Sequence, residues 1–376
     1  MKKKICFVIG TRPEIIKLGP VYNYFKTKKD FKISNFFTTQ HSEIGQDVVK
    51  YFNFKTQKKG RIKNYNLDLN YKMSEICKNL SDYLKSNRIN AIFVLGDTLT
   101  AMIAAITAFN LKIKIFYVES GLRTYDFLEP WPEEGYRRLI SGISNFHFCP
   151  TINNKKNLLT ENIKSKNICV SGNPAIDAIY DELKKHDLVY QKKLIRRIKK
   201  KGYEIKDRKI VIVTIHRREN FGYRFLKICE TIKLLSNKYN NIDFVITVHP
   251  NPYVKKTLNK TLKKLKNVFL IKPLFYPEFI FLSSKAKLVM SDSGGMQEEL
   301  PTLKKYLILL REKTERKETI NLGYSFVCGS YKNKILKKFK YLIHLNNENK
   351  KFKQNPFGNG NSSRKIYKFT LEKLSK

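Results

Sequence analysis

The chain has 376 residues, with 74 Lys and Arg against 32 Asp and Glu, which gives a formal net charge of +42 at pH 7. The length predicts two medium-sized domains, because single hydrophobic cores stop growing at about 250–300 residues. A hydrophobic content of 42% with 12% aromatic residues excludes intrinsic disorder. The charge favours either a protein that binds nucleic acid or an anionic membrane, or an enzyme with an anionic substrate. Composition leaves both classes open.

The beginning of the chain and the cysteines bear on location. Residues 2–4 are basic and Ile5–Ile9 are apolar, as in a signal peptide, but the run stops at Gly10 without a small-residue cleavage site. No stretch approaches the roughly 18 apolar residues that a membrane-spanning helix needs. The six cysteines include no Cys-x-x-Cys pair, which argues against a disulfide framework and a zinc site. We therefore expect a cytoplasmic protein with reduced thiols, no bound metal ion and no membrane insertion.

Short apolar segments alternate with longer amphipathic ones in the first half of the chain. Buried strands are predicted at Ile5–Ile9, Ala91–Leu95, Ile113–Val118, Phe146–Cys149 and Ile168–Val170. Helices are predicted at Pro13–Lys28, Ser74–Lys85 and Thr98–Asn110. This alternation is typical of βαβ units and a parallel sheet.

A second alternating series follows a helix predicted at Ala175–Lys185 and a very basic stretch, Lys192–Lys209. Its predicted strands are Ile210–Ile215, Asp243–Val248, Val268–Ile271, Leu288–Ser291 and Tyr306–Leu310. Its predicted helices are Arg224–Lys238 and Met296–Leu300, and a final helix is predicted at Ser362–Leu374.

The predicted fold class is therefore α/β, with two Rossmann-like domains whose parallel sheets face a cleft. We assign residues 1–172, joined by a C-terminal helix within residues 355–376, to the first domain and residues 173–354 to the second. The sequence contains neither a G-x-G-x-x-G nor a G-x-x-x-x-G-K-[ST] motif, which argues against a dinucleotide and against a P-loop nucleotide site.

In parallel sheets, ligands bind beyond the carboxyl ends of the strands. Arg12 stands where the first predicted helix begins, and Lys17 lies one turn further on. A helix N-terminus flanked by two cations favours anion binding. A surface arginine at a helix cap is the alternative.

Carboxylates follow two further strands of the first half. Asp97 comes after Ala91–Leu95, Glu119 comes after Ile113–Val118, and Glu133 lies shortly beyond, next to Arg137. Clustered carboxylates beside arginine suit general acid–base catalysis. Two alternatives stay open: Asp97 could be an N-cap, and the cluster could be an ion-pair network.

The second half repeats this arrangement. His216 and His249 follow neighbouring predicted strands, and two histidines so placed favour contact with a ligand. Ser293-Gly294-Gly295 forms a turn whose backbone N–H groups could approach a phosphate. Glu298 or Glu299, one turn further, could bind ribose hydroxyls.

Eleven short motifs occur in order along the chain. They are Gly10-Thr11-Arg12-Pro13-Glu14-x-x-Lys17, Gln40-His41, Gly96-Asp97-Thr98, Val118-Glu119-Ser120-Gly121-Leu122-Arg123-Thr124, Pro132-Glu133-Glu134, His216-Arg217-Arg218-Glu219, His249-Pro250-Asn251-Pro252, Pro273-Leu274-x-Tyr276, Ser291-Asp292-Ser293-Gly294-Gly295-x-Gln297-Glu298-Glu299, Thr314-Glu315-Arg316 and Asn355-Pro356-x-Gly358. Together they resemble the motifs of the non-hydrolysing UDP-N-acetylglucosamine 2-epimerase family. The family usually has His where this chain has Tyr117.

The resemblance implies the two-domain fold of B-type glycosyltransferases, with UDP bound between the domains, no metal ion, no cofactor and a homodimeric assembly. Carried over by motif, the residues implied to contact the UDP-sugar are Arg12, Lys17, Asp97, Glu119, His216, Leu274, Phe279, Ser293, Gly294, Gly295, Glu299 and Arg316. The implied catalytic group is Asp97, Glu119, Glu133 and His216.

The implied reaction interconverts UDP-GlcNAc and UDP-ManNAc, which would supply ManNAc-type sugars for surface polysaccharides. Three alternatives remain: a glycosyltransferase of the same fold, a related epimerase that is hydrolysing or takes a modified hexosamine, and a non-enzymatic nucleic-acid binder. The last would need basic residues and stacking aromatics together on one face. We expect no specific nucleic-acid partner.

Overall fold

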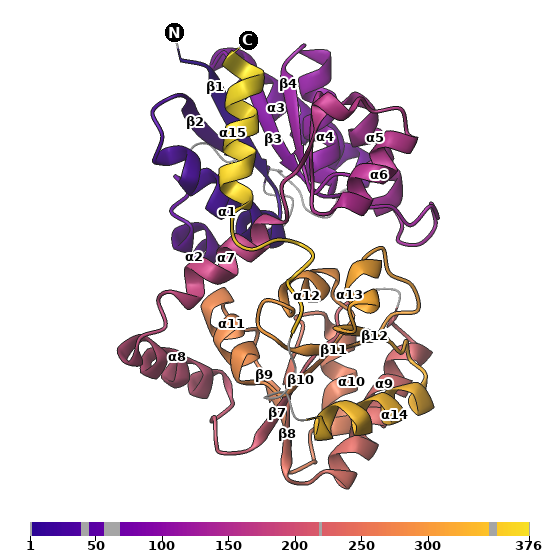
Figure 1. Cartoon of the computed structure of the whole chain (residues 1–376). Coiled ribbons are helices and arrows are strands. Elements are labelled where there is room, and N and C mark those ends of the chain that lie inside the picture. The colour runs from indigo at the N-terminus through magenta and orange to yellow at the C-terminus, as the bar shows by residue number, and fades with distance from the viewer. Residues whose placement is uncertain (1, 39–44, 56–67, 218–219, 346–351, 376) are drawn as a thin grey trace. The chain divides into compact units, whose positions relative to one another are not determined.

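The computed structural model describes residues 2–38, 45–55, 68–217, 220–345 and 352–375. It divides into two compact units, one formed by Met1–Ala178 with Phe357–Lys376 and the other by Ile179–Pro356. Each unit contains one six-stranded sheet whose paired strands are all parallel (Figure 1). The predicted α/β fold class with two parallel sheets is confirmed.

The sheet of the first unit has the strand order β2-β1-β3-β4-β5-β6. Its strands are β1 (Lys4–Ile9), β2 (Lys32–Phe37), β3 (Ala91–Leu95), β4 (Lys114–Val118), β5 (Phe146–Cys149) and β6 (Ile168–Val170). The helices are α1 (Arg12–Lys26), α2 (Gln46–Tyr51), α3 (Leu69–Ser86), α4 (Leu99–Asn110), α5 (Glu133–Ile143), α6 (Ile152–Thr160), α7 (Pro174–Leu183) and α15 (Ser362–Ser375). By the unit boundaries, α7 begins in the first unit and ends in the second.

Aromatic side chains cover one face of this sheet. The rings of Phe7 and Phe93 stack at 4.8 Å, and those of Phe93 and Phe116 at 5.1 Å, because successive strands present their alternate side chains to the same face. Phe369 of α15 packs on this layer, 5.5 Å from the ring of Phe148. The last helix of the chain therefore belongs to the core of the first unit (Figure 1).

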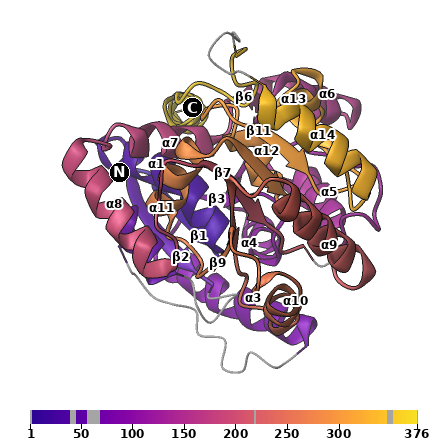
Figure 2. The ribbon, with the colours of Figure 1, turned by 90° about the horizontal axis from the view of Figure 1, so that it is seen from below.

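The sheet of the second unit has the strand order β12-β11-β10-β7-β8-β9. Its strands are β7 (Lys209–Thr214), β8 (Ile242–Thr247), β9 (Val268–Ile271), β10 (Leu288–Ser291), β11 (Tyr306–Leu309) and β12 (Ser325–Val327). Its helices are α8 (Leu188–Lys201), α9 (Tyr223–Lys238), α10 (Pro252–Leu262), α11 (Tyr276–Lys285), α12 (Gly294–Glu299), α13 (Lys317–Asn321) and α14 (Lys332–His344). In Figure 2, α9 and α14 lie side by side, and both contribute to the buried core under β7 and β8.

The described segments contain neither a membrane-spanning helix nor a cluster of metal-ligating side chains. None of the helices in the described ranges combines the length and apolar character needed to cross a membrane. Within the same ranges, no group of three or more His, Cys, Asp or Glu side chains could hold a metal ion.

Candidate functional site

A buried ion pair joins two residues that sequence analysis selected at the carboxyl edge of the first sheet. Nζ of Lys17, in α1, lies 2.5 Å from Oε1 of Glu119, which follows β4. The two side chains are only 11% and 5% exposed. Glu119 has a φ of 65°, in the left-handed region that non-glycine residues rarely adopt. The chain therefore bends sharply after β4, and this bend holds the carboxylate against the lysine.

Glu14 fixes the turn between β1 and α1, where Arg12 is the first helical residue. Its Oε2 accepts the backbone N–H groups of Gly10 and Thr11 at 2.7 and 2.6 Å, and its Oε1 accepts the Thr98 hydroxyl at 2.6 Å. Burial raises the pKa of the Glu14 carboxyl, although these hydrogen bonds oppose the shift. Glu14 thus connects the ends of β1 and β3, and it is a positioning residue that the sequence argument did not select.

Asp97 forms an ion pair with Arg137 of α5. Nε and Nη2 of Arg137 lie 2.8 and 2.6 Å from Oδ2 of Asp97, and its Nη1 lies 3.2 Å from the fully buried Glu134. The N-cap of α4 is Thr98, whose hydroxyl accepts the N–H of Ala101 at 3.0 Å. The alternative that Asp97 caps this helix is therefore wrong, whereas the ion-pair network is present.

Glu133 is the first residue of α5, half-buried beside Glu134. Burial raises the pKa of Tyr136, and the nearby charge of Glu133 adds to the shift. The carboxylates of Asp97, Glu119 and Glu133 thus all come from segments that follow β3 and β4.

Tyr117 lies under these groups on β4. Its side chain is fully buried, and its hydroxyl has no hydrogen-bond partner among the described residues. Burial raises its pKa; the charges of Arg123 and Arg137 oppose the shift, and those of Asp97 and Glu119 add to it. The hydroxyl therefore lies within the electrostatic influence of both ion pairs.

In the second unit, Asp292 holds the segment that carries His216. The backbone N–H groups of His216 and Arg217 donate to its Oδ2 at 3.1 and 2.9 Å, and Nδ2 of Asn220 donates at 2.9 Å. Nδ1 of His216 lies 3.4 Å from Oδ1, and the imidazole is 41% exposed. Asp292 is fully buried, so it is suited to position His216 rather than to contact a ligand. Sequence analysis placed Asp292 in a motif but did not recognise this role.

The turn Ser293-Gly294-Gly295 begins α12 beneath the guanidinium of Arg316. A Cβ atom on Gly294 would lie 2.8 Å from Nη1 of Arg316, so a larger residue at this position would force the guanidinium to shift. Nε of Arg316 donates to Oε1 of the buried Glu298 at 2.6 Å. Glu298 and Glu299 were both candidates for binding ribose hydroxyls, and Glu298 is engaged by Arg316 instead. Glu299 lies at the half-buried end of α12.

The remaining selected residues follow neighbouring strands of the second sheet. Leu274, buried, and Phe279, half-buried, come after β9, and His249 comes after β8. The His249 ring stacks on that of His216 with centroids 6.1 Å apart. Burial, and then the charge of His216, lower the pKa of His249. The structure therefore places His216 and His249 in contact at this edge, as expected of neighbouring strand ends.

Two motif segments, Gln40-His41 and Arg218-Glu219, lie outside the described residues. Within each unit, the selected residues in the described ranges lie at the carboxyl edge of that unit's sheet. The first edge combines paired carboxylates and cations, which can exchange protons. The second combines a glycine turn, an arginine and a histidine, which can bind a diphosphate.

Comparisons with known proteins point to one family. The family model described as UDP-N-acetylglucosamine 2-epimerase matches residues 23–371. The UDP-N-acetylglucosamine 2-epimerase of Campylobacter jejuni is 38% identical over 377 residues, which cover 99% of this chain and 98% of that protein.

Two solved structures are similar over almost the whole chain. The UDP-GlcNAc 2-epimerase from Neisseria meningitidis bound to UDP-GlcNAc has a TM-score of 0.93 at 37% identity, covering 98% of this chain and 100% of that one. The Methanocaldococcus jannaschii enzyme in complex with UDP-GlcNAc and UDP has a TM-score of 0.84 at 31% identity, covering 98% and 99%. From the family match and these full-length relatives, we conclude that the chain belongs to the UDP-N-acetylglucosamine 2-epimerase family.

Proposed function

We propose that this protein is a non-hydrolysing UDP-N-acetylglucosamine 2-epimerase, which interconverts UDP-GlcNAc and UDP-ManNAc. The observation that carries the proposal is a pair of ion pairs at one sheet edge, Lys17 with Glu119 and Arg137 with Asp97. The chain that holds them aligns over 98% of its length with an epimerase bound to UDP-GlcNAc. These pairs supply carboxylates held by cations, which the chemistry at C2 of the sugar requires.

The C2 hydrogen of an N-acetylhexosamine is not adjacent to a carbonyl, so a carboxylate cannot remove it directly. In the proposed reaction, the C1–O bond to UDP breaks first, and its electron pair leaves with the diphosphate. A carboxylate then takes the C2 proton, and the C2–H electron pair forms the C1=C2 double bond of 2-acetamidoglucal. Return of a proton to the opposite face of C2 and re-addition of UDP at C1 give the epimer.

The leaving diphosphate needs charge stabilisation as the C1–O bond breaks. We assign this role to Arg12 and Lys17 in the first unit, and to His216, Arg316 and the backbone of Ser293–Gly295 in the second. The turn suits a phosphate because Gly294 brings the backbone directly under the Arg316 guanidinium. Glu299 would bind the ribose, and Leu274 and Phe279 would provide apolar contacts to the nucleotide.

Proton transfer is assigned to the carboxylates. Asp97, Glu119 and Glu133 are the proposed acid–base groups, with His216 at the second edge. Asp97 is 28% exposed on its side chain, so it remains accessible while Arg137 holds it. Glu119 is more deeply buried and would be reached once the sugar has displaced water.

We also propose that the enzyme is a homodimer and that its product supplies polysaccharide synthesis, as the family resemblance implies. Phe109 of α4 and Leu139 of α5 support the assembly, because they are 57% and 54% exposed on two helices that pack together. Light scattering should give twice the chain mass for the wild type, and the double variant Phe109→Ser/Leu139→Ser should give a lower mass. A monomeric wild type would contradict the homodimer.

The reaction is tested by incubation with UDP-GlcNAc in D₂O, with NMR analysis of the sugars. UDP-ManNAc carrying deuterium at C2 is expected, and epimer without deuterium would contradict the elimination mechanism. Free ManNAc with UDP would indicate a hydrolysing enzyme, and a requirement for an acceptor would indicate a glycosyltransferase. Glu119→Gln should abolish exchange, whereas the exposed matched control Glu372→Gln should retain it.

A further inference from the structure

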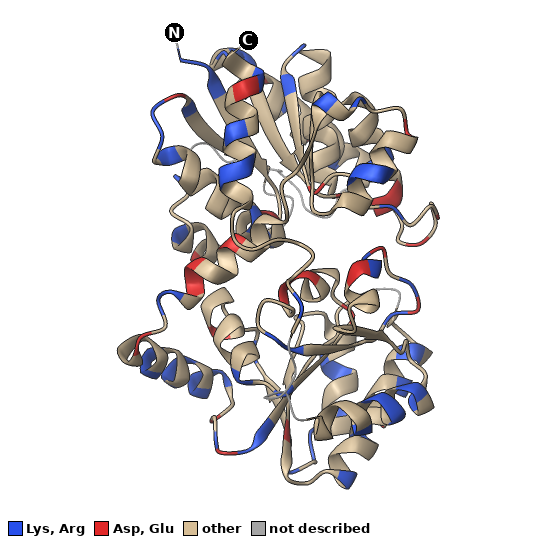
Figure 3. Ribbon diagram, in the orientation of Figure 1, with Lys and Arg blue, Asp and Glu red and all other residues tan. Residues whose placement is uncertain are grey.

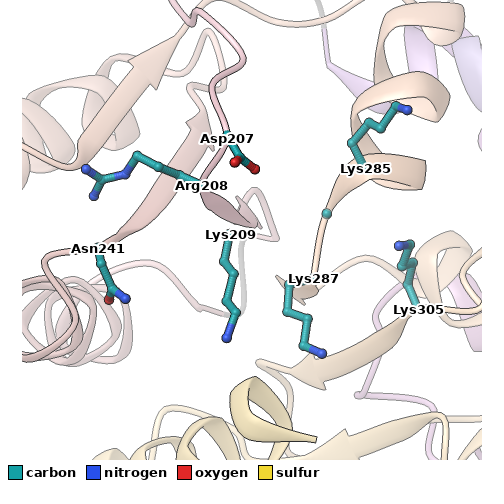
Figure 4. A pocket seen from close by; sticks show the side chains of 8 residues that line it. Asp207, Arg208, Lys209, Asn241, Lys285, Lys287 and Lys305 are labelled. Atoms are coloured by element: carbon teal, nitrogen blue, oxygen red, sulfur yellow. The ribbon is translucent and has the colours of Figure 1, made fainter. Parts of the chain in front are cut away.

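A basic hollow lies at the amino edge of the second sheet, at the opposite ends of the strands from the candidate site. It has a volume of about 570 Å³. Figure 4 shows Lys209, Lys285, Lys287 and Lys305 around this hollow, with Asp207 at its rim. β7 has six residues and therefore spans about 20 Å, which separates this hollow from His216 beyond the other end of the strand.

The strand order explains why the lysines gather there. β11, β10 and β7 are consecutive neighbours, and Lys305, Lys287 and Lys209 stand at their amino ends. The pairing of Leu288 with Tyr306 places Lys287 beside Lys305 in the register. Because parallel strands begin at the same edge, residues 78 to 96 positions apart in the chain approach one another.

The acidic groups of this region, as far as the described residues extend, do not neutralise Lys209, Lys285 or Lys305. Asp243 is engaged by Arg208 at 2.7 Å and by the Tyr203 hydroxyl at 3.1 Å. Of the described residues that line the hollow, Asp207 is the sole carboxylate. Among all described residues, no carboxylate lies within ion-pair distance of Lys209, Lys285 or Lys305.

The neighbouring positive charges change the pKa of Lys305. Its ammonium is partly buried, and burial lowers its pKa, with further lowering by the charges of Lys287 and Lys285. Like charges held together without counter-charges destabilise a fold, and a bound anion would remove that cost. The basic row on α8, visible in Figure 3, also borders a hollow, but its lysines and arginines come from one helix rather than from three strand ends.

We propose that the hollow binds a small multivalent phosphate-type anion, such as inorganic pyrophosphate, at a site separate from the candidate substrate site. The three unneutralised ammonium groups of Lys209, Lys285 and Lys305 match a ligand with two or three negative charges. Asn241 contributes an amide to the same wall. A concave site bordered by strand ends favours a free small anion over an extended polymer.

Site-resolved acylation of lysine amines tests this proposal on the wild-type chain, with mass spectrometry of the modified peptides. Pyrophosphate, at constant ionic strength, should reduce labelling of Lys209 and Lys305 by more than it reduces labelling of the exposed Lys78 and Lys85 on α3. This readout is local, so it does not depend on whether the candidate substrate site also binds the anion. Equal protection of all four lysines would overturn the proposal, and so would the absence of protection at every one of them.

Calorimetry provides a second measurement, with pyrophosphate titrated into protein saturated with UDP. Lys209→Gln/Lys305→Gln should bind at least about tenfold more weakly than wild type, equivalent to about 1.4 kcal/mol. The matched control Lys78→Gln/Lys85→Gln removes the same charge from the exposed face of α3 and should bind as the wild type does. If both double variants weaken binding equally, net charge rather than the hollow is responsible. Tighter binding of a long DNA duplex than of pyrophosphate, lost in the same variant, would instead indicate a polymer site.

Discussion

The ammonium of Lys17 lies 2.5 Å from the carboxylate of Glu119, although 102 positions separate the two residues in the chain. The pair connects α1 to the segment after β4 and is almost fully buried. A buried charge that loses its partner is costly, because neither water nor another counter-charge replaces it.

Lys17→Met should therefore destabilise the protein by about 3–5 kcal/mol, since it removes the counter-charge that lies 2.5 Å from the buried Glu119 carboxylate. Urea unfolding measures this change. The double variant Lys17→Met/Glu119→Gln should recover much of the stability without recovering epimerisation. If the double variant is as unstable as Lys17→Met, the charge pairing is not the cause.

Gly294→Ala should weaken UDP binding, because the new Cβ would lie 2.8 Å from Arg316 and displace its guanidinium from Glu298. Overpacking of this kind costs about 1–3 kcal/mol. Calorimetry with UDP and urea unfolding measure the two effects. The control is Gly142→Ala in α5, where nothing lies within 4 Å of the added Cβ. Gly142→Ala should be more stable than the wild type by about 0.5–1 kcal/mol. Unchanged UDP binding in Gly294→Ala would contradict the assignment of the Ser293–Gly295 turn and Arg316 to the diphosphate.

Asp292→Asn should lower kcat more than it raises KM. The amide keeps one acceptor oxygen, but it loses the negative charge and places an NH2 group at one of the two positions that face His216, so the His216 segment should shift. An unsatisfied buried donor also costs about 1–3 kcal/mol of stability. Asp243→Asn is the matched control, since Asp243 is a buried aspartate near the opposite edge of the same sheet. The control should lose a similar amount of stability but keep its kcat. If kcat falls equally in both variants, Asp292 does not act by positioning His216.

Stability should fall as the pH decreases from about 6.5 to 4 because of His147. Burial lowers the pKa of His147 from 6.5 to about 4, so in this window the unfolded chain binds more protons than the folded protein. The stability contributed by neutral His147 is complete above pH 6.5 and is lost progressively below it, by about 3 kcal/mol in all. His147→Gln should flatten the pH dependence of the unfolding free energy measured in urea. An unchanged slope in the variant would exclude His147 as the cause.

Tyr117→Phe should leave stability unchanged or raise it by about 1 kcal/mol, because the Tyr117 hydroxyl is buried without a hydrogen-bond partner among the described residues. Tyr203→Phe is the matched control, since its hydroxyl bonds to Asp243 at 3.1 Å and its loss should destabilise. Thermal unfolding compares the two variants. Equal destabilisation by both would show that the Tyr117 hydroxyl has a partner in solution.

Much of the fold could be predicted from local sequence patterns. β3, β5, β6, β9 and β10 begin and end where the apolar segments do, since a buried parallel strand is apolar on both faces. β2 was missed because it is an edge strand with polar residues in its first half and pairs with β1 alone. The basic stretch Lys192–Lys209 was not assigned a helix, although α8 covers most of it. Only Leu194 and Ile198 of that helix are fully buried, so its apolar stripe is narrow.

By itself, the sequence determined the alternation of strands and helices, and which residues follow each strand. Those properties are local: periodicity, glycine turns and the residue types at strand ends. Only the tertiary structure showed that Asp97 pairs with Arg137 rather than capping α4, that Glu298 is engaged by Arg316, and that Asp292 holds the His216 segment. Each of these contacts joins segments that follow different strands. The partner of a charged side chain therefore depends on strand order, which neighbouring residues in the sequence do not specify.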